Sequence, residues 1–221
     1  MANNLSLKDL ISAKRLSCYK NINEHFDNLI FISKITPKIA TIEICVRNIF
    51  DMYQPKDWII NSQDNEILKQ VQIIQHRYGN DSINHEQYLS NLTLGQVVYL
   101  VKQSGLNHSV FFDNIDNIDF KKYCSLNINY YKNIKGEKTK LSNQQKMKII
   151  LSLLVDIRNR SYHWENILKT KINDNNPDKV FPRISTNIKN TTIGIMPDKI
   201  NVFLDDVLDM INVDIKQFLN I

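Results

Sequence analysis

The spacing of hydrophobic residues along the 221-residue chain predicts a mostly helical protein. Only five glycines and five prolines are present, so we expect long helices with few breaks. The most apolar predicted helix covers 143–163, with Asn143 as its N-cap. The other predicted helices cover 6–22, 26–53, 63–78, 92–103 and 198–220. Pro37 is expected to kink or divide the segment 26–53, and Gly105 to stop the helix before it.

Two stretches lack this helical pattern. Residues 79–93 are predicted to form a loop. Residues 173–197 combine three prolines and many asparagines with a β-branched patch, which predicts a surface excursion with a short hairpin outside the core. The expected fold class is therefore all-α: a single helical bundle over residues 1–221, in which the excursion precedes a C-terminal helix at 198–221.

The composition is typical of a soluble protein, with 43% hydrophobic and 23% charged residues. No apolar stretch approaches the roughly 20 residues of a membrane span, and the first residues lack an export signal, so we expect a cytoplasmic protein without a membrane partner. The three cysteines have no CxxC spacing, which argues against disulfides and thiolate metal sites. No cofactor or metal is expected, because four histidines lie scattered without ligand spacing: His25, His76, His85 and His108.

Positive charge is concentrated in residues 120–148, which hold eight lysines against one glutamate. Residues 196–221 are acidic, with five aspartates against two lysines. Lysines suit phosphates and aromatic rings stack on unpaired bases, so the basic stretch predicts RNA binding. The alternative is a solvated lysine-rich loop. The candidate RNA-binding residues are Lys121, Lys122, Tyr123, Tyr130, Tyr131, Lys132, Lys135, Lys138 and Lys140.

A cluster of polar residues, "RNRSYHWE" at 158–165, ends the apolar helix. The inward-facing stripe of this helix continues at Arg158, four positions after Leu154. A buried guanidinium needs an anion, either a carboxylate such as Glu165 or a phosphate. Asn159 and His163 are four positions apart and share a helix face beside this arginine.

A second polar group lies upstream in "TIEICVRNIF" at 41–50. Glu43 and Arg47 have the spacing of an ion pair within a helix, and Asn48 follows them. One interpretation is a buried ionic network that joins this helix to the helix of Arg158 and Glu165. An ionic network of this kind does not require His163. An imidazole that titrates near neutrality is suited to proton transfer.

The segment "RNRSYHWE" resembles the R-N-R-x-x-H-x-E motif of the HEPN superfamily, specifically the abortive-infection (Abi-like) proteins of bacteria. Three further segments are similar to elements of that family in the same order: "SAKRLSCY" (12–19), "EICVRN" (43–48) and "LTLGQVVYLV" (92–101). The chain departs from the family at Tyr162, where a small residue is usual, and at Trp164, where a second histidine is common.

The resemblance implies a metal-independent endoribonuclease of an antiphage or toxin type, acting as a homodimer that brings two motifs together. His163 would be the general base or acid, Arg158 would bind the scissile phosphate, and Asn159 would orient the phosphate or the 2′-OH. Glu165 would position Arg158 or Arg160, with Glu43, Arg47 and Asn48 in supporting positions. The alternatives are a non-catalytic HEPN module that binds RNA, such as a small noncoding RNA, or a partner protein such as an antitoxin. A purely structural helical protein is the third alternative.

Overall fold

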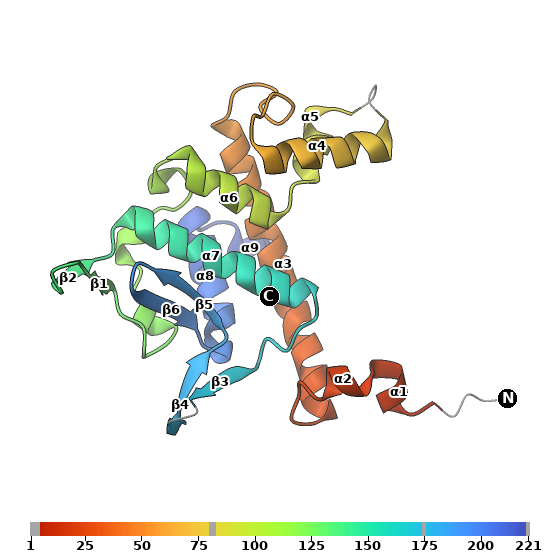
Figure 1. Cartoon of the computed structure of the whole chain (residues 1–221), viewed down its shortest axis with the longest axis vertical. Helices are drawn as coiled ribbons and strands as arrows, with labels where there is room; N and C mark the ends of the chain where they lie inside the picture. Colours follow the sequence, from red (N-terminus) through yellow and green to blue (C-terminus); the bar gives the residue numbers. More distant parts are fainter. Residues whose placement is uncertain (1–4, 80–82, 174–175, 220–221) are drawn as a thin grey trace.

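The computed structural model describes residues 5–79, 83–173 and 176–219 (Figure 1). About 58% of the chain is helical. The α-helices are α1 (Leu7–Ile11), α2 (Ala13–Leu16), α3 (Ile22–Met52), α4 (Asn65–Tyr78), α5 (His85–Ser90), α6 (Leu94–Ser104), α7 (Asn143–Tyr162), α8 (Ile200–Ile211) and α9 (Lys216–Leu219). The 3-10 helices are η1 (His108–Val110), η2 (Ile115–Asn117), η3 (Phe120–Lys122) and η4 (Pro197–Lys199).

The described residues also form three two-stranded antiparallel sheets, so the prediction of an all-α protein is wrong. The strands are β1 (Tyr130–Lys132), β2 (Lys138–Lys140), β3 (Thr170–Asn173), β4 (Asn176–Pro182), β5 (Ile184–Ile188) and β6 (Thr191–Ile195). They pair β1 with β2, β3 with β4, and β5 with β6. The protein is a mixed structure in which helices predominate.

The β5–β6 hairpin belongs to the core, contrary to the prediction for 173–197. Ile184, Ile193 and Ile195 are buried, and the hairpin contacts α7. Its inner face therefore contributes apolar area to the protein interior, which a surface excursion would not do. Gly194 is required there, because a Cβ atom would lie 3.0 Å from the carbonyl oxygen of Ile184 and would clash with the ring of Pro182.

A buried amide fixes this hairpin to the preceding segment. The Asn127 side chain donates to the carbonyl oxygens of Phe120 (2.7 Å) and Gly194 (2.8 Å), and accepts the Gly194 N–H (2.9 Å). The Asn190 side chain bonds both backbone groups of Lys132, and thereby joins the β5–β6 turn to β1. The bonds of Asn127 satisfy buried backbone groups, which would otherwise be left without a partner in the interior.

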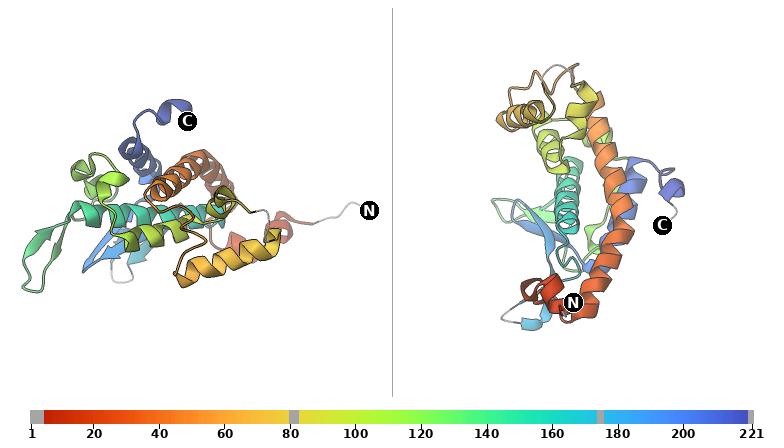
Figure 2. Two further views of the ribbon diagram at one scale, coloured as in Figure 1. Left: turned by 90° about the horizontal axis from the view of Figure 1, so that it is seen from above. Right: turned by 90° about the vertical axis from the view of Figure 1, so that its right-hand side faces the viewer.

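Helix α3 is the long axis of the molecule, and α6, α7 and α8 pack on it (Figures 1 and 2). Pro37 neither divides the helix nor ends it. Proline in a helix interior costs about 3 kcal/mol. Here the cost is offset by continuous burial on both sides of the proline, at Ile32, Ile35, Ile39 and Ile42.

The predicted helix 6–22 is two short helices instead of one. Ser12 has a φ of 72°, which a continuing helix cannot adopt. It ends α1, and its side chain caps α2 by accepting the Arg15 N–H at 3.2 Å. The break matters because Figure 2 shows the N-terminal segment folding back beside the start of α3.

The remaining helix predictions differ in outcome. Those for 63–78, 92–103 and 143–163 are confirmed by α4, α6 and α7, and Gly105 follows α6 in the left-handed conformation. The N-cap of α7 is Ser142, not Asn143. The predicted loop 79–93 contains α5, and the predicted helix 198–220 stops at Ile211, where the extended Asn212 ends it.

Candidate functional site at the end of α7

Glu43 on α3 holds Arg158 on α7. The Arg158 Nε donates to Glu43 Oε2 at 3.2 Å, and Oε1 of the same carboxylate accepts the Leu94 N–H at 3.0 Å. The side chains of Glu43 and Arg158 are only 14% and 21% exposed. One carboxylate thus joins three helices, and charge-assisted bonds of this kind fix the direction of the guanidinium.

Tyr162 supports the same arginine from the next turn. The Arg158 guanidinium carbon lies 4.6 Å from the centre of the Tyr162 ring, a cation–π contact at the i, i+4 spacing. Burial raises the pKa of the Tyr162 hydroxyl. Arg158 Nη1 also lies 3.5 Å from Asn159 Oδ1. The guanidinium is therefore placed by contacts on several sides.

The predicted ion pair between Glu43 and Arg47 is wrong, because the Glu43 carboxylate faces α6 and α7. Arg47 is half-buried, and its Nε has no hydrogen-bond partner among the described residues. Asn48 is exposed. The predicted network between the two helices exists in part, since α3 and α7 are joined by Glu43 and Arg158.

Glu165 contacts Arg160, not Arg158. Its Oε2 lies 2.7 Å from Arg160 Nη1 and 3.5 Å from Arg183 Nη2, and Arg160 Nε also bonds Asp156 at 2.9 Å. Of the two roles predicted for Glu165, the geometry matches the positioning of Arg160. These ion pairs stabilise the segment that follows α7.

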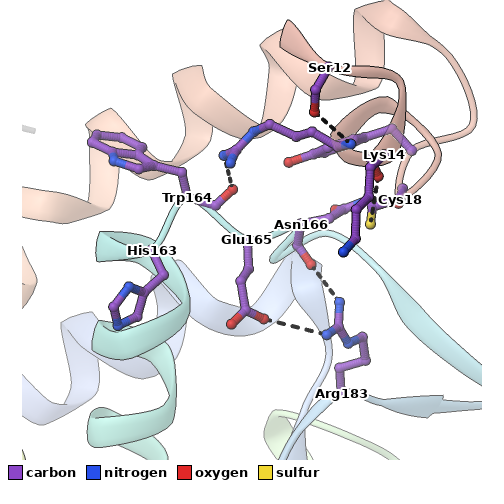
Figure 3. A pocket seen from close by; sticks show the side chains of 10 residues that line it. Ser12, Lys14, Cys18, His163, Trp164, Glu165, Asn166 and Arg183 are labelled. Atoms are coloured by element: carbon purple, nitrogen blue, oxygen red, sulfur yellow. Dashed lines mark hydrogen bonds and ion pairs between the residues drawn. The ribbon is translucent and has the colours of Figure 1, made fainter.

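His163 is the C-cap of α7, and its backbone N–H donates to the Asn159 carbonyl oxygen at 3.0 Å. The imidazole is exposed and has no hydrogen bond or ion pair to the described residues. Figure 3 shows the ring pointing away from Glu165. Asn159, one turn earlier, is also exposed. Both side chains are therefore accessible to a ligand that approaches the end of α7.

The segment that follows His163 is held by residues that the sequence analysis missed. Asn28, fully buried on α3, donates to the Glu165 carbonyl oxygen at 3.0 Å and accepts the Ile167 N–H at 2.9 Å. Arg15 donates to the Trp164 carbonyl oxygen. Asn28 could have been identified from the sequence, because it is a polar residue on the otherwise apolar stripe of α3. No local pattern could identify Arg15, because its partner is 149 positions away.

A cavity of about 400 Å³ lies beside this segment. Ser12, Lys14, Arg15, Cys18 and Tyr19 line one side, and the other side is formed by His163, Trp164, Glu165, Asn166 and Arg183 (Figure 3). Trp164 has a φ of 55°, an unusual conformation for a bulky residue, and its side chain is half exposed.

The predicted basic region is only partly available to a ligand. Tyr123 cannot stack on a base as predicted, because it is 1% exposed and its hydroxyl donates to Asp206 at 2.6 Å. Burial and this bond raise the pKa of the Tyr123 hydroxyl. Lys121 and Lys122 are both exposed, but Lys122 pairs with the same aspartate.

The β1–β2 hairpin carries the other residues of this set. It projects from the body of the protein near the start of α7 (Figures 1 and 2). Its lysines, Lys132, Lys135, Lys138 and Lys140, are exposed and have no ion pair within the described part of the chain. Tyr130 is half-buried beneath Lys138, whose Nζ lies 5.0 Å from the ring centre, and Tyr131 packs against the core.

No family model, curated protein sequence or solved structure matches this chain. No helix in the described ranges is both long and apolar enough to cross a membrane. The described residues contain no cluster of three or more His, Cys, Asp or Glu side chains that could hold a metal ion.

Proposed function

We propose that this protein is a metal-independent endoribonuclease of the Abi-like HEPN type, with an antiphage or toxin role. The observation that carries the proposal is that the end of α7 presents both a fixed guanidinium and an accessible imidazole. Arg158 is fixed by Glu43 and Tyr162, while the His163 ring is exposed and makes no bond to the described residues. A fixed cation suits a phosphate, and an accessible imidazole suits proton transfer.

The proposed reaction is attack by a ribose 2′-OH on the adjacent phosphorus. A base takes the hydroxyl proton, the new O–P bond forms, and the bond to the 5′-oxygen breaks as an acid protonates that oxygen. The products are a 2′,3′-cyclic phosphate and a 5′-OH end. Arg158 binds the negative charge that grows on the phosphate oxygens, and Asn159 orients the phosphate or the 2′-OH.

Each chain supplies one His163, whereas the reaction needs a base and an acid. A homodimer would place two copies of His163 and of Arg158 around one phosphate. The exposure of Asn159 and His163 is compatible with such a composite site. Glu43 and Glu165 act as positioning residues, for Arg158 and Arg160 respectively.

The test is incubation of the full chain with single-stranded RNA in excess EDTA, with product ends identified by phosphatase and kinase treatment. We expect cleavage that leaves 2′,3′-cyclic phosphate and that His163→Ala and Arg158→Ala abolish. His76→Ala is the matched control, since His76 is exposed and lies on α4. Cleavage that persists in both site variants, with helical circular dichroism unchanged, would show that the assignment is wrong.

A second candidate function is RNA binding without cleavage, for example of a small noncoding RNA that regulates the protein. The exposed lysines of the β1–β2 hairpin favour it, because they have no ion pairs among the described residues and lie near the start of α7, whereas His163 is the C-cap of that helix. An antitoxin protein is the alternative regulator. Salt-dependent RNA binding that is equal in the wild type and in His163→Ala, with no cleavage, would support this function.

A further inference from the structure

The cavity beside His163 is positively charged. Three cationic side chains, Lys14, Arg15 and Arg183, line it with one carboxylate, Glu165. That carboxylate is shared, since its Oε2 lies 2.7 Å from Arg160 Nη1 and 3.5 Å from Arg183 Nη2. The exposed Lys14 has no ion pair among the described residues. The cavity therefore has uncompensated positive charge, which favours an anionic ligand.

The walls of the cavity are held in place by hydrogen bonds. Arg183 Nη1 donates to the Asn166 carbonyl oxygen at 3.2 Å. The buried Asn166 side chain donates to the Cys18 carbonyl oxygen at 2.9 Å. Arg15 binds the Trp164 backbone. The two arginines are thus held by contacts within the protein, so that less side-chain entropy is lost when a ligand binds them, whereas Lys14 is free to reach the ligand.

The positions of the side chains divide the cavity into two parts. Lys14 and Arg183 extend toward each other from opposite walls, whereas the rings of Trp164 and His163 project on the other side of Glu165 (Figure 3). Trp164 is 50% exposed despite its size, and its left-handed backbone sets the direction of the indole. Residues in rare backbone conformations cluster at functional sites, and tryptophan is enriched at binding interfaces.

We infer that this cavity binds the RNA strand next to the cleaved bond, with a phosphate between Lys14 and Arg183 and a base stacked on Trp164. The inference rests on the proposed function, and it makes the cavity the subsite that fixes the strand relative to His163. An electrostatic contact combined with base stacking requires no particular base, so the subsite recognises single-stranded RNA generally. A free nucleotide shares this chemistry and is the competing source of the phosphate.

The test measures binding without cleavage. The probe is a tetraribonucleotide with 2′-O-methyl groups, which keeps the phosphates and bases but lacks the attacking hydroxyl. We expect Lys14→Gln to weaken its binding about tenfold and to reduce the salt slope by about 0.7. Lys8→Gln is the matched control, because Lys8 is an exposed lysine of α1 outside the cavity. Equal binding by both variants would overturn the inference.

Tryptophan fluorescence tests the stacking. The chain has two tryptophans, and Trp58 packs against Phe50. We expect saturation with the tetranucleotide to quench the emission of the wild type but not that of Trp164→Phe. Adenosine 5′-monophosphate should bind much more weakly than the tetranucleotide. Binding of the mononucleotide with equal affinity would show a free-nucleotide site and contradict the RNA subsite.

Failure of this inference can be separated from failure of the proposed function. If the protein cleaves RNA in EDTA and Lys14→Gln binds the probe as tightly as the wild type, the proposed nuclease activity is supported and the proposed subsite is contradicted. If the wild type binds the probe in a Lys14-dependent way but cleaves no RNA, the cavity is supported as an RNA-binding site and the proposed nuclease activity is contradicted.

Discussion

Glu43 and Arg158 lie 115 positions apart in the chain, and a 3.2 Å hydrogen bond joins their side chains. The carboxylate also caps the first turn of α6 through the Leu94 N–H. Glu43 therefore has two functions, one in stability and one in the direction of Arg158. The two functions can be distinguished by comparing a substitution that removes only the charge of Glu43 with one that removes the whole side-chain carboxylate.

We expect Glu43→Ala to lower the free energy of unfolding by about 1–3 kcal/mol, because it leaves the Leu94 N–H without an acceptor and a partly buried guanidinium without its carboxylate. Glu43→Gln keeps an acceptor for the Leu94 N–H and should cost less. Urea unfolding measures both. RNA cleavage, assayed where all variants are folded, should lose kcat in both variants with little change in KM. A loss that simply follows the unfolded fraction would contradict a positioning role.

The sequence predicts well those features that depend on local periodicity. The apolar positions of α4, α6 and α7 recur at helical spacing, and the same stripe places Arg158 toward the interior. The partner of Arg158 could not be identified in this way. The local spacing of Glu43 and Arg47 indicated an ion pair, but the packing of α6 and α7 on α3 determines which charge the carboxylate meets.

The sheets were harder to predict because their stability does not come from local sequence. Only five residues form each of β5 and β6, and a lone hairpin of that size is marginal in water. Packing on α7 and the buried amide of Asn127 stabilise it. The many asparagines of 173–197 indicated a surface loop, whereas the side chain of Asn190 bonds the backbone of Lys132 on β1.

Asn28 allows a test of how the end of α7 is held. Asn28→Ala removes the side chain that binds the Glu165 carbonyl oxygen and the Ile167 N–H. We expect a loss of about 1–3 kcal/mol for each buried group left unpaired. Hydrogen exchange of the Ile167 amide should become faster. Asn23→Ala is the control, since Asn23 is exposed on the same helix and should change stability by less than about 0.5 kcal/mol.

His25 should make stability depend on pH. The residue is 4% exposed, and its Nδ1 has no hydrogen-bond partner in the described chain. Burial, and then the charge of Arg15, lower the pKa of the imidazole. Below its ordinary pKa of about 6.5 the unfolded chain binds a proton that the folded protein does not. Stability due to this group is therefore complete above that pH and falls as the pH drops, by at most about 1.4 kcal/mol per pH unit.

The measurement is urea unfolding between pH 8 and pH 5, a range chosen to span the ordinary pKa of about 6.5. We expect His25→Gln to be less stable at pH 8, because it loses the ring contacts with Tyr19 and Phe26. Its stability should nevertheless fall less steeply with pH than that of the wild type. His76→Gln, at an exposed position, should keep the wild-type slope. Parallel slopes for His25→Gln and the wild type would contradict the assignment.

The β1–β2 hairpin and His163 lie at opposite ends of α7, whose 20 residues span about 30 Å. A stacked strand rises about 3.4 Å per nucleotide, so four stacked nucleotides cover about 14 Å and cannot reach both. The hairpin lysines should therefore affect long RNAs only. We expect Lys135→Gln/Lys138→Gln to weaken binding of a 20-nucleotide 2′-O-methyl RNA and to reduce its salt slope by about 1.4. Binding of the tetranucleotide should not change.

The matched control is Lys34→Gln/Lys56→Gln, which removes the same charge at exposed positions of α3 and the segment after it. If the hairpin acts only through the net charge of the protein, both double variants should weaken the long RNA equally, since long-range attraction depends on total charge. If it contacts phosphates, only the hairpin variant should lose salt dependence, because each contact releases its own counterions. Equal salt slopes in the two variants would therefore show that the hairpin lysines are solvent-exposed charges without phosphate contacts. RNA binding would then depend on the end of α7.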